Sequence, residues 1–336
     1  MTSGTTHIQM NDSICWGILG TGKIARQFAA GLQILPEAKL LAVGSRTCVG
    51  AEAFGQQFKV PHRHASYEAL ITDPQVDVIY VATPHSCHKA NTLLALSAGK
   101  AVLCEKPFTI NAREAEQVIT FARAKKLFLM EAMWTRCFPL MEKLRQLLAS
   151  KTIGDVRMLT ADFGFFAEYH DEERLFNPAF GGGALLDVGV YPVSLASMLF
   201  GPPTQIASLA HLGWTGVDEQ AAMLFSHSQG QLAILSTAVR VDTCQEAVIL
   251  GSEGRLRIHR PWWRPTTMTL SREGVADEVM EFPLSGNGYQ FEAAEVMRCL
   301  REGKTESPMM PLNETLSIMR TLDAVRAQWG LHHPTD

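Results

Sequence analysis

Three side chains in this sequence are of types that together move protons and stabilise charge on oxygen. Lys106 directly follows the apolar run 101–104 in a Glu-Lys-Pro triplet, and Asp187 and Tyr191 lie in a later apolar segment. Residues four apart on a helix share a face, so this carboxylate and this phenol are expected side by side. A tyrosine beside a lysine can have a lowered pKa and act as a general acid or base. The set suggests proton transfer at an oxygen; a core Asp–Tyr pair and a charged surface turn are the structural alternatives.

A glycine-rich motif typical of dinucleotide binding comes earlier in the chain. It follows an apolar strand expected over residues 14–19, opens a helix, and reads Gly20-Thr21-Gly22-Lys23-Ile24-Ala25. The first glycine allows a tight turn, the second lets the backbone approach a pyrophosphate, and the alanine allows close helix packing. The helix N-terminus then favours phosphate. An ordinary tight turn is the alternative, but the position in a first βαβ unit favours a dinucleotide.

The end of the next strand indicates which dinucleotide. An Asp or Glu there would accept hydrogen bonds from the ribose 2′-OH, but the chain has Gly44-Ser45-Arg46. A guanidinium suits a 2′-phosphate, and it can also stack on adenine. We therefore predict that Ser45 and Arg46 favour NADP over NAD; a solvated loop charge at Arg46 is the alternative.

Alternating apolar strands and helices must position these residues. Up to residue 131, strands are expected at 14–19, 40–44, 76–82, 101–104 and 127–130, with helices between them that include 23–32, 87–98 and 112–124. This alternation predicts right-handed crossovers and a doubly wound parallel (Rossmann) sheet. Ligands bind outside the carboxyl ends of such strands, where the glycine motif and Lys106 would meet.

The pattern changes after residue 133 and predicts a second domain of α+β type. A helix at 140–148 precedes an alternating run at 155–166, a polar loop at 168–180 and an apolar helix at 181–200. Further strands are expected at 206–212, 221–225, 232–239, 247–250 and 256–259, and further helices at 289–300 and 313–329. The spacing favours an antiparallel or mixed sheet. We predict a cofactor domain at 1–132 and a second, substrate-binding domain at 133–310.

Composition narrows the partners. The 336 residues carry a net charge of −4 without a basic stripe, so no nucleic-acid partner is expected. The N-terminus has no signal-peptide pattern, and no apolar stretch looks long enough to span a bilayer, so no membrane association is expected. Seven scattered cysteines, an odd number without a C-x-x-C pair, suggest reduced thiols and a cytoplasmic protein.

Several other residues suggest chemistry less strongly. His62 with His64, and His85 with His88, are spaced like metal ligands, but neither pair has a recognisable third ligand, so no metal is expected. Trp262-Trp263 could be a substrate wall or plain packing, and the sequence leaves both open. Cys104 beside the lysine has no activating base and is interpreted as a packing residue.

Taken together, the motifs resemble the glucose–fructose oxidoreductase / inositol dehydrogenase / MocA family. The family pattern is a glycine loop, then Glu-Lys-Pro, then Gly-Gly-x-x-x-Asp-x-Gly-x-His or Tyr, and all three parts occur here in order, the last over residues 182–191. Tyr191 occupies the position where many members carry histidine. With the run Met-Glu-Ala-Met-Trp-Thr-Arg at 130–136, this resembles the dimeric dihydrodiol dehydrogenase branch, which includes NADP-linked xylose dehydrogenases.

The resemblance implies roles for particular residues. Lys106 would polarise the substrate oxygen and lower the pKa of Tyr191, which would pass the proton, while Asp187 orients the substrate or the nicotinamide. The cofactor-facing positions would also include Thr83, Pro84, His88 and Glu105, and the pocket wall would include Trp134, Arg136 and Phe165. It further implies an open-sheet second domain whose flat face forms a homodimer, and a final helix, about 311–329, that packs back near the first domain.

These observations predict an NADP-dependent oxidoreductase acting on a small molecule. Hydride would move between the nicotinamide and a secondary alcohol, hemiacetal or carbonyl of a sugar, polyol or dihydrodiol. Two alternatives stay open: a cofactor-retaining oxidoreductase or glycosidase, and an NADP-binding sensor without turnover.

Overall fold

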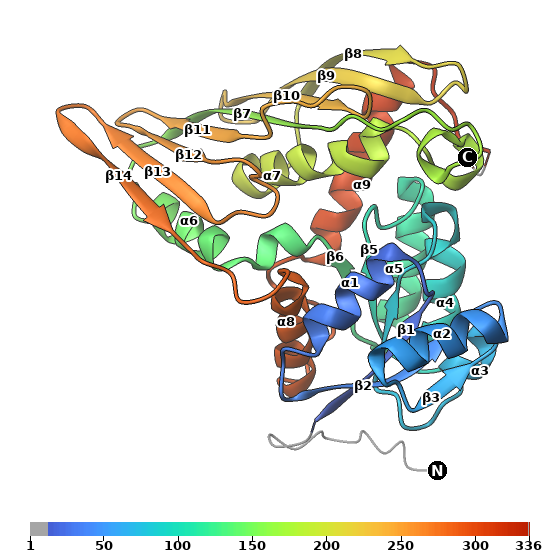
Figure 1. Ribbon diagram of the computed structural model, residues 1–336. Helices are drawn as coiled ribbons and strands as arrows, with labels where there is room; N and C mark the ends of the chain where they lie inside the picture. The colour runs from blue at the N-terminus through green and yellow to red at the C-terminus, as the bar shows by residue number, and fades with distance from the viewer. Residues whose placement is uncertain (1–12, 335) are drawn as a thin grey trace.

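The protein is built around two β-sheets. The computed structural model describes residues 13–334 and 336, and it places the two sheets one above the other with helices between and beside them (Figure 1).

The first sheet has six parallel strands in the order β3-β2-β1-β4-β5-β6. These strands are β1 (Ile14–Leu19), β2 (Ala38–Gly44), β3 (His62–His64), β4 (Val78–Val81), β5 (Ala101–Glu105) and β6 (Leu129–Ala132). Their helices are α1 (Lys23–Leu32), α2 (Cys48–Phe58), α3 (Tyr67–Ile71), α4 (His88–Ser97) and α5 (Ala112–Lys125). The strand order reverses between β1 and β4, which is where ligands bind in this class of sheet. The predicted Rossmann sheet is confirmed; β3 was not among the predicted strands.

The second sheet has eight strands in the order β14-β13-β12-β11-β7-β10-β9-β8, and within it only β7 and β10 pair in parallel. The strands are β7 (Val156–Gly164), β8 (Gln205–Leu212), β9 (Asp218–Ser226), β10 (Leu232–Ala238), β11 (Ala247–Gly251), β12 (Arg255–Ile258), β13 (Thr267–Arg272) and β14 (Val275–Glu281). The predicted mostly antiparallel sheet is confirmed. The β13–β14 hairpin was missed because β14 is exposed along nearly its whole length and lacks the alternation of a half-buried strand.

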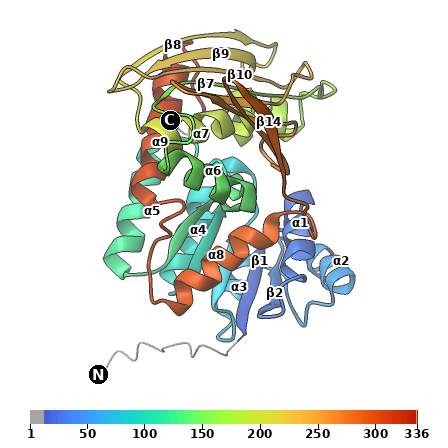
Figure 2. The same ribbon diagram turned by 90° about the vertical axis from the view of Figure 1, so that its left-hand side faces the viewer.

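Helices cover one face of the second sheet and leave the other bare (Figures 1 and 2). On the covered face lie α7 (Val190–Phe200) and α9 (Leu312–Ala327), with α6 (Pro139–Ala149) nearer the first sheet. The stretch Pro178–Phe200 is long and apolar enough to cross a membrane, contrary to the expectation from sequence. Because 78% of its apolar window is buried inside the protein, this is weak evidence for a membrane span.

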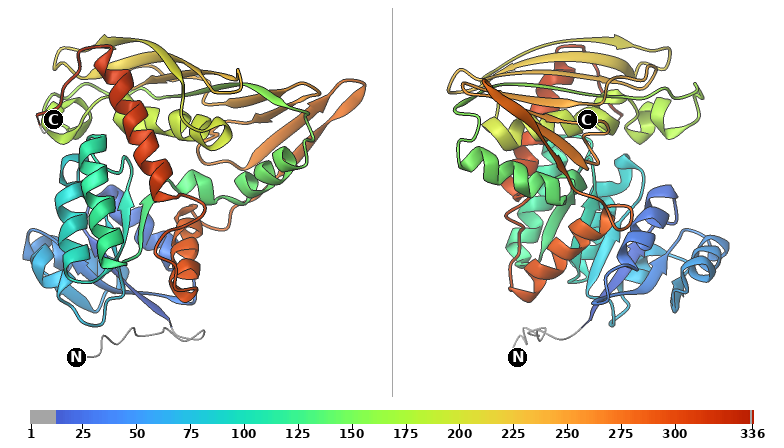
Figure 3. Two further views of the ribbon diagram at one scale, coloured as in Figure 1. Left: turned by 180° about the vertical axis from the view of Figure 1, so that it is seen from behind. Right: turned by 60° about the vertical axis from the view of Figure 1, so that its left-hand side comes forward.

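Two late helices return to the first sheet. Helix α8 (Tyr289–Arg301) lies beside α1, and α9 runs from α5 and β6 up to the second sheet (Figure 3). Thr315 of α9 donates a 2.9 Å hydrogen bond to the buried Glu131, and Asp323 accepts one of 2.8 Å from the Ala112 amide. Buried polar contacts of this kind hold the two halves in a fixed relation.

Candidate active site

The turn after β1 requires glycine. Gly20 has φ +111°, and a Cβ there would lie 2.6 Å from the carbonyl oxygen of Ala82, which follows β4. Its amide donates to the Gly44 carbonyl at the end of β2, at 2.9 Å. The carboxyl ends of three neighbouring strands therefore converge on a position that only glycine fits.

The start of α1 suits a phosphate group. Its N-cap, Gly22, makes no side-chain capping bond, the first turn contains no acid, and no heavy atom lies within 4 Å of where a Cβ of Gly22 would be. Thr21, Gly22 and Lys23 border a cavity of about 530 Å³, and Ile24 is exposed. The first amides of a helix have no partner within the helix, so these are available to a pyrophosphate. The residues present thus fit a dinucleotide.

The end of β2 carries a hydroxyl and a cation. Ser45 is buried and donates its amide to the His64 carbonyl at 3.0 Å, while the Arg46 side chain is exposed. No acid stands at this strand end, where one would bind an unmodified ribose.

His88 fastens the loop after β4 to the loop after β5. Its ring lies between the carbonyls of Pro107, at 2.8 Å, and Thr83, at 2.9 Å, and Asn91 donates to the Thr83 hydroxyl at 3.0 Å. Burial lowers the pKa of His88 to about 4, so the imidazole is neutral. Both ring nitrogens face main-chain carbonyls, so His88 helps to fix the position of Thr83 and of Pro107. The Lys106–Pro107 peptide bond, whose isomer the sequence could not indicate, is cis.

Lys106, at the end of β5, joins the first sheet to the helical segment below the second. Its Nζ donates a 2.7 Å hydrogen bond to the main-chain oxygen of Asp187 and lies 4.9 Å from the centre of the Tyr191 ring. Burial lowers the pKa of the Lys106 ammonium, although Asp187 and Glu105 raise it in part. The structure therefore brings the three predicted catalytic side chains together.

The expectation of a lowered Tyr191 pKa is wrong. Burial raises the pKa of this phenol well above its usual value, Glu105 raises it further, and the hydrogen bond from Trp134 opposes them in part. The reason is geometric, since the Lys106 ammonium lies over the ring face and bonds to a carbonyl rather than to the hydroxyl. The Tyr191 oxygen instead accepts a 2.9 Å hydrogen bond from Trp134 Nε1. At neutral pH Tyr191 is a phenol, a proton donor.

Asp187 is held as a carboxylate by a residue that sequence reasoning missed. Arg174, from the polar loop, donates to Asp187 Oδ1 at 2.8 Å and to His85 Nε2 at 3.0 Å. Burial raises the pKa of Asp187, but the charges of Lys106 and Arg174 outweigh it and the net shift is downward. Burial lowers the pKa of His85, whose other nitrogen donates to the Gly181 carbonyl at 3.1 Å. The spacing of Arg174 in the sequence gives no sign that it is a site residue, because only the folded loop brings it to Asp187.

The segment that carries Asp187 is not a regular α-helix, and a buried carboxylate binds the main-chain amide at its start. Asp218 accepts a 2.6 Å hydrogen bond from the Leu185 amide and lies where a Cβ of Gly183 would be, which explains the glycine. Residues Leu185–Gly189 form a π-helical turn before α7. Such turns are rare and occur frequently at functional sites.

Aromatic rings surround the Tyr191 phenol. Trp134 stacks on Tyr289 with ring centres 4.3 Å apart, and Phe163 stacks on Trp263 at 4.8 Å. Tyr191 lies 5.2 Å from Phe163 and 6.4 Å from Trp263, between ring centres. The two tryptophans of the Trp262-Trp263 pair therefore have different roles. Trp263 belongs to the wall around Tyr191, whereas Trp262 is a core residue whose Nε1 donates to the Asp162 carbonyl at 2.7 Å.

The structure also shows where the other two predicted wall residues, Arg136 and Phe165, lie. Arg136 is buried and donates to the Ser194 carbonyl and to Glu314, both at 2.7 Å, so its guanidinium joins α7 to α9. It borders a separate cavity of about 660 Å³ whose lining includes none of the three predicted catalytic residues. Phe165 follows β7 and is half-buried, with its amide bonded to the Ala238 carbonyl at 3.1 Å.

Glu105 lies behind the lysine. It accepts a hydrogen bond from the Tyr80 hydroxyl and one from the Lys106 amide at 3.1 Å, and burial raises its pKa. Glu292 of α8 is another buried acid here, whose oxygens have no hydrogen-bond partner among the described residues. Burial and the charge of Glu105 raise the pKa of Glu292 well above its usual value. Glu105 thus orients the main chain at Lys106.

A dinucleotide-binding sheet beside a lysine and a phenol defines a class of protein, the nicotinamide-dependent oxidoreductases. Comparison with known families agrees: residues 14–133 match the oxidoreductase family GFO/IDH/MocA with its NAD-binding Rossmann fold, and residues 141–257 match the C-terminal domain of the same family. The chain belongs to the GFO/IDH/MocA family and is an NAD(P)-dependent oxidoreductase. The predicted family and cofactor class are confirmed.

Individual relatives align over nearly the whole chain. Trans-1,2-dihydrobenzene-1,2-diol dehydrogenase of Homo sapiens is 39% identical over 335 residues, covering 96% of this chain and 98% of that protein. The enzyme of the same name from Xenopus tropicalis is 35% identical, with 95% and 99% covered. Among solved structures, a 3-ketoreductase from Actinomadura kijaniata in complex with NADP and TDP-benzene has a TM-score of 0.84 and 27% identity, with 94% and 98% covered.

Proposed function

We propose that this enzyme transfers hydride between NADP and a secondary alcohol or carbonyl on a ring-shaped substrate, with a trans-dihydrodiol as the first candidate and a sugar or polyol as the second. One observation carries the proposal: Lys106 Nζ, Tyr191 and Asp187 meet at the carboxyl end of β5, on the same edge of the parallel sheet as the glycine loop after β1. The relatives named as dihydrodiol dehydrogenases support the substrate class, and flat aromatic rings around Tyr191 suit an arene-derived ring.

In the direction of reduction, the chain's own groups handle the proton and the charge. Tyr191, a phenol at neutral pH, donates its proton to the substrate oxygen, and Lys106 stabilises the negative charge that develops there. Trp134 Nε1 stabilises the phenolate that forms, and Asp187, fixed by Arg174, orients the substrate. When bound, the nicotinamide supplies the hydride. Oxidation reverses each step and starts from the deprotonated tyrosine.

NADP is proposed over NAD because Arg46 is exposed at the end of β2, where no acid stands. The Actinomadura kijaniata structure, solved with NADP, supports this choice. Gly20, Thr21, Gly22, Lys23 and Ile24 would hold the pyrophosphate, and Ser45 with Arg46 the 2′-phosphate.

A homodimer through the bare face of the second sheet is also proposed. Leu209 is 81% exposed there, on β8, and Leu224 and Ile234 face each other across β9 and β10 while exposed.

The proposed boundary near residue 132 falls between β6 and the turn Trp134–Cys137. Seven free cysteines support a cytoplasmic location.

The test is a cofactor titration followed by a substrate screen. Purified protein is titrated with NADPH and NADH, and the preferred cofactor is assayed with trans-dihydrodiols, pentoses, hexoses and dicarbonyls. We expect tighter NADPH binding and turnover of one class. Y191F and K106M should lose turnover by about 10²–10⁴-fold while still binding NADPH. Unchanged turnover in both variants would refute the mechanism, and cofactor that stays bound through dialysis would indicate a cofactor-retaining enzyme.

A further inference from the structure

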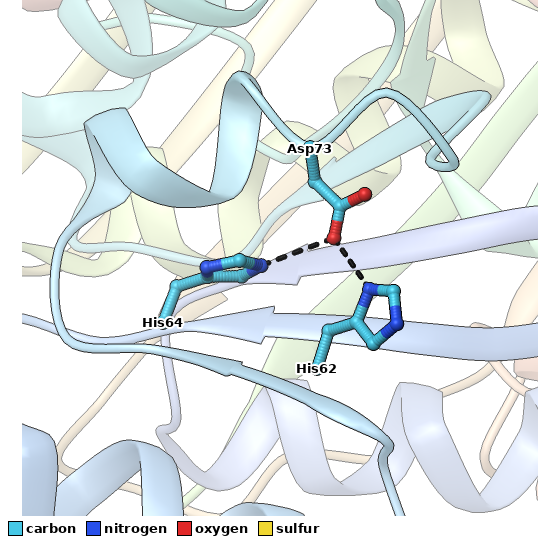
Figure 4. Close-up of side chains that lie close together, drawn as sticks. All are labelled: His62, His64 and Asp73. Carbon is cyan, nitrogen blue, oxygen red and sulfur yellow. Dashed lines mark hydrogen bonds and ion pairs between the residues drawn. The ribbon is translucent and has the colours of Figure 1, made fainter.

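A second polar cluster lies at the edge of the first sheet, away from the lysine and tyrosine. His62 and His64 stand two residues apart on β3, so their side chains point to the same face of the strand. Asp73 follows α3 and turns its carboxylate towards both rings (Figure 4). The sequence analysis expected no metal because the histidine pair lacked a third ligand; the fold brings one from nine residues beyond His64.

The donor atoms converge on one point. Asp73 Oδ2 lies 2.6 Å from His62 Nδ1 and 3.1 Å from His64 Nε2 (Figure 4), and one donor atom from each residue lies within 4.8 Å of the others. The two imidazole planes stand at 88° to each other, so they approach the carboxylate from different directions. Tetrahedral Zn²⁺, bound at about 2.0–2.1 Å, holds its ligand atoms roughly 3.3 Å apart. The two measured spacings, 2.6 and 3.1 Å, are somewhat shorter than that value, so the carboxylate must move slightly away from the rings to admit an ion.

Surrounding bonds hold this carboxylate in place. Asp73 Oδ1 accepts a 3.0 Å hydrogen bond from the Gln75 amide, and the Asp73 carbonyl accepts one of 2.6 Å from Lys100 Nζ. Burial raises the pKa of Asp73, but the hydrogen bonds that it accepts from His62, Gln75 and His64 outweigh burial, and the net shift is downward. Metal ligands characteristically have such outer partners. The carboxylates of Asp73 and Asp77 both lie near the Lys100 ammonium and partly offset its charge.

We propose that His62, His64 and Asp73 form a binding site for a divalent transition-metal ion, with Zn²⁺ as the best-matched ion. Two imidazoles and one carboxylate are ligands that Zn²⁺ accepts, and they leave the fourth tetrahedral position to water. All three side chains are only partly exposed or buried, which limits the competition from solvent. On binding, each ring keeps its proton on the nitrogen that faces away from the ion.

The test is zinc binding to the metal-stripped full-length protein, followed by calorimetry. We expect one ion per chain in the wild type, and an affinity at least about a hundredfold weaker in H64Q and in D73N, because losing a ligand costs more than losing an outer partner. H170Q removes an exposed histidine outside the cluster and should bind like the wild type. Zinc should raise the thermal unfolding midpoint of the wild type and H170Q only.

Cobalt distinguishes this cluster from the free cysteines, two of which are exposed. The wild-type Co²⁺ complex should show the visible bands of a tetrahedral nitrogen and oxygen site without thiolate charge-transfer absorption. This readout needs no variant, so it decides the question even if H64Q or D73N fails to fold. Absence of stoichiometric zinc binding, equal affinity in H64Q and D73N, or a thiolate band would each overturn the proposal.

Discussion

The hydrogen bond from Trp134 to Tyr191 should assist catalysis, and W134F tests it. The substitution removes the Nε1 donor, which lies 2.9 Å from the phenol oxygen, and keeps an aromatic ring over Tyr289. During reduction Tyr191 changes from phenol to phenolate, so the bond changes from a neutral to a charge-assisted one. Only the part of an interaction that strengthens in the transition state accelerates the reaction.

The magnitude follows from typical bond strengths. A neutral hydrogen bond contributes about 0.5–1.5 kcal/mol and one to a charged group about 1.5–3 kcal/mol, so the strengthening is roughly 1–1.5 kcal/mol. At about 1.4 kcal/mol per factor of ten, W134F should lower kcat about 5- to 12-fold, with KM nearly unchanged. Oxidation and reduction should slow equally at one pH, because a substitution leaves the overall equilibrium unchanged.

The assay is steady-state kinetics in both directions, with W263F as the matched control. Trp263 also lies beside Tyr191, at 6.4 Å between ring centres, but its Nε1 bonds to Gln245 at 3.3 Å. W263F should alter packing without this loss of kcat, and thermal unfolding checks that both variants are folded. The reasoning fails if W134F keeps kcat within twofold of wild type, or if W263F slows as much as W134F.

Three further variants test the cofactor loop and the carboxylate. G20A should destabilise the fold by about 1–3 kcal/mol and weaken NADPH binding at least tenfold, because it places a Cβ on a residue with φ +111°, at 2.6 Å from the Ala82 oxygen. Calorimetry measures the loss of stability and a fluorescence titration measures the loss of NADPH affinity. Normal NADPH binding by G20A would contradict the proposed role of this loop. R46S should weaken NADPH about 10- to 100-fold and leave NADH unchanged, because a charge-assisted bond to the 2′-phosphate is lost; equal weakening of both cofactors would contradict that role. R174M should raise the pKa of Asp187, whose carboxylate Arg174 now favours, so activity that depends on ionised Asp187 is lost at a higher pH as the solution is acidified. The acidic limb of the pH profile of kcat/KM measures this shift. If R174M leaves the apparent pKa of that limb unchanged, activity does not depend on the ionisation of Asp187.

The sequence by itself determined the first sheet and most of the second. Buried parallel strands read as continuous apolar runs, and β1, β4 and β5 are buried almost throughout, so their pattern is strong in a single chain. The glycine at position 20 and the Glu-Lys-Pro triplet were also visible, because backbone geometry and strand ends restrict the residues that fit there. β3 and the β13–β14 hairpin were not predicted, since β3 is only three residues long and β14 is exposed on both faces.

Only the tertiary structure decided which groups surround the chemistry. Arg174 reaches Asp187 from an irregular loop, Trp134 reaches Tyr191 from a turn 57 residues earlier in the chain, and Asp73 reaches the β3 histidines from beyond a helix. The hydrophobic periodicity of the sequence does not predict such contacts, because they depend on how elements distant in sequence pack together. The pKa of Tyr191 belongs to the same category: its direction depends on burial and on where the Lys106 ammonium points, and both are properties of the folded chain.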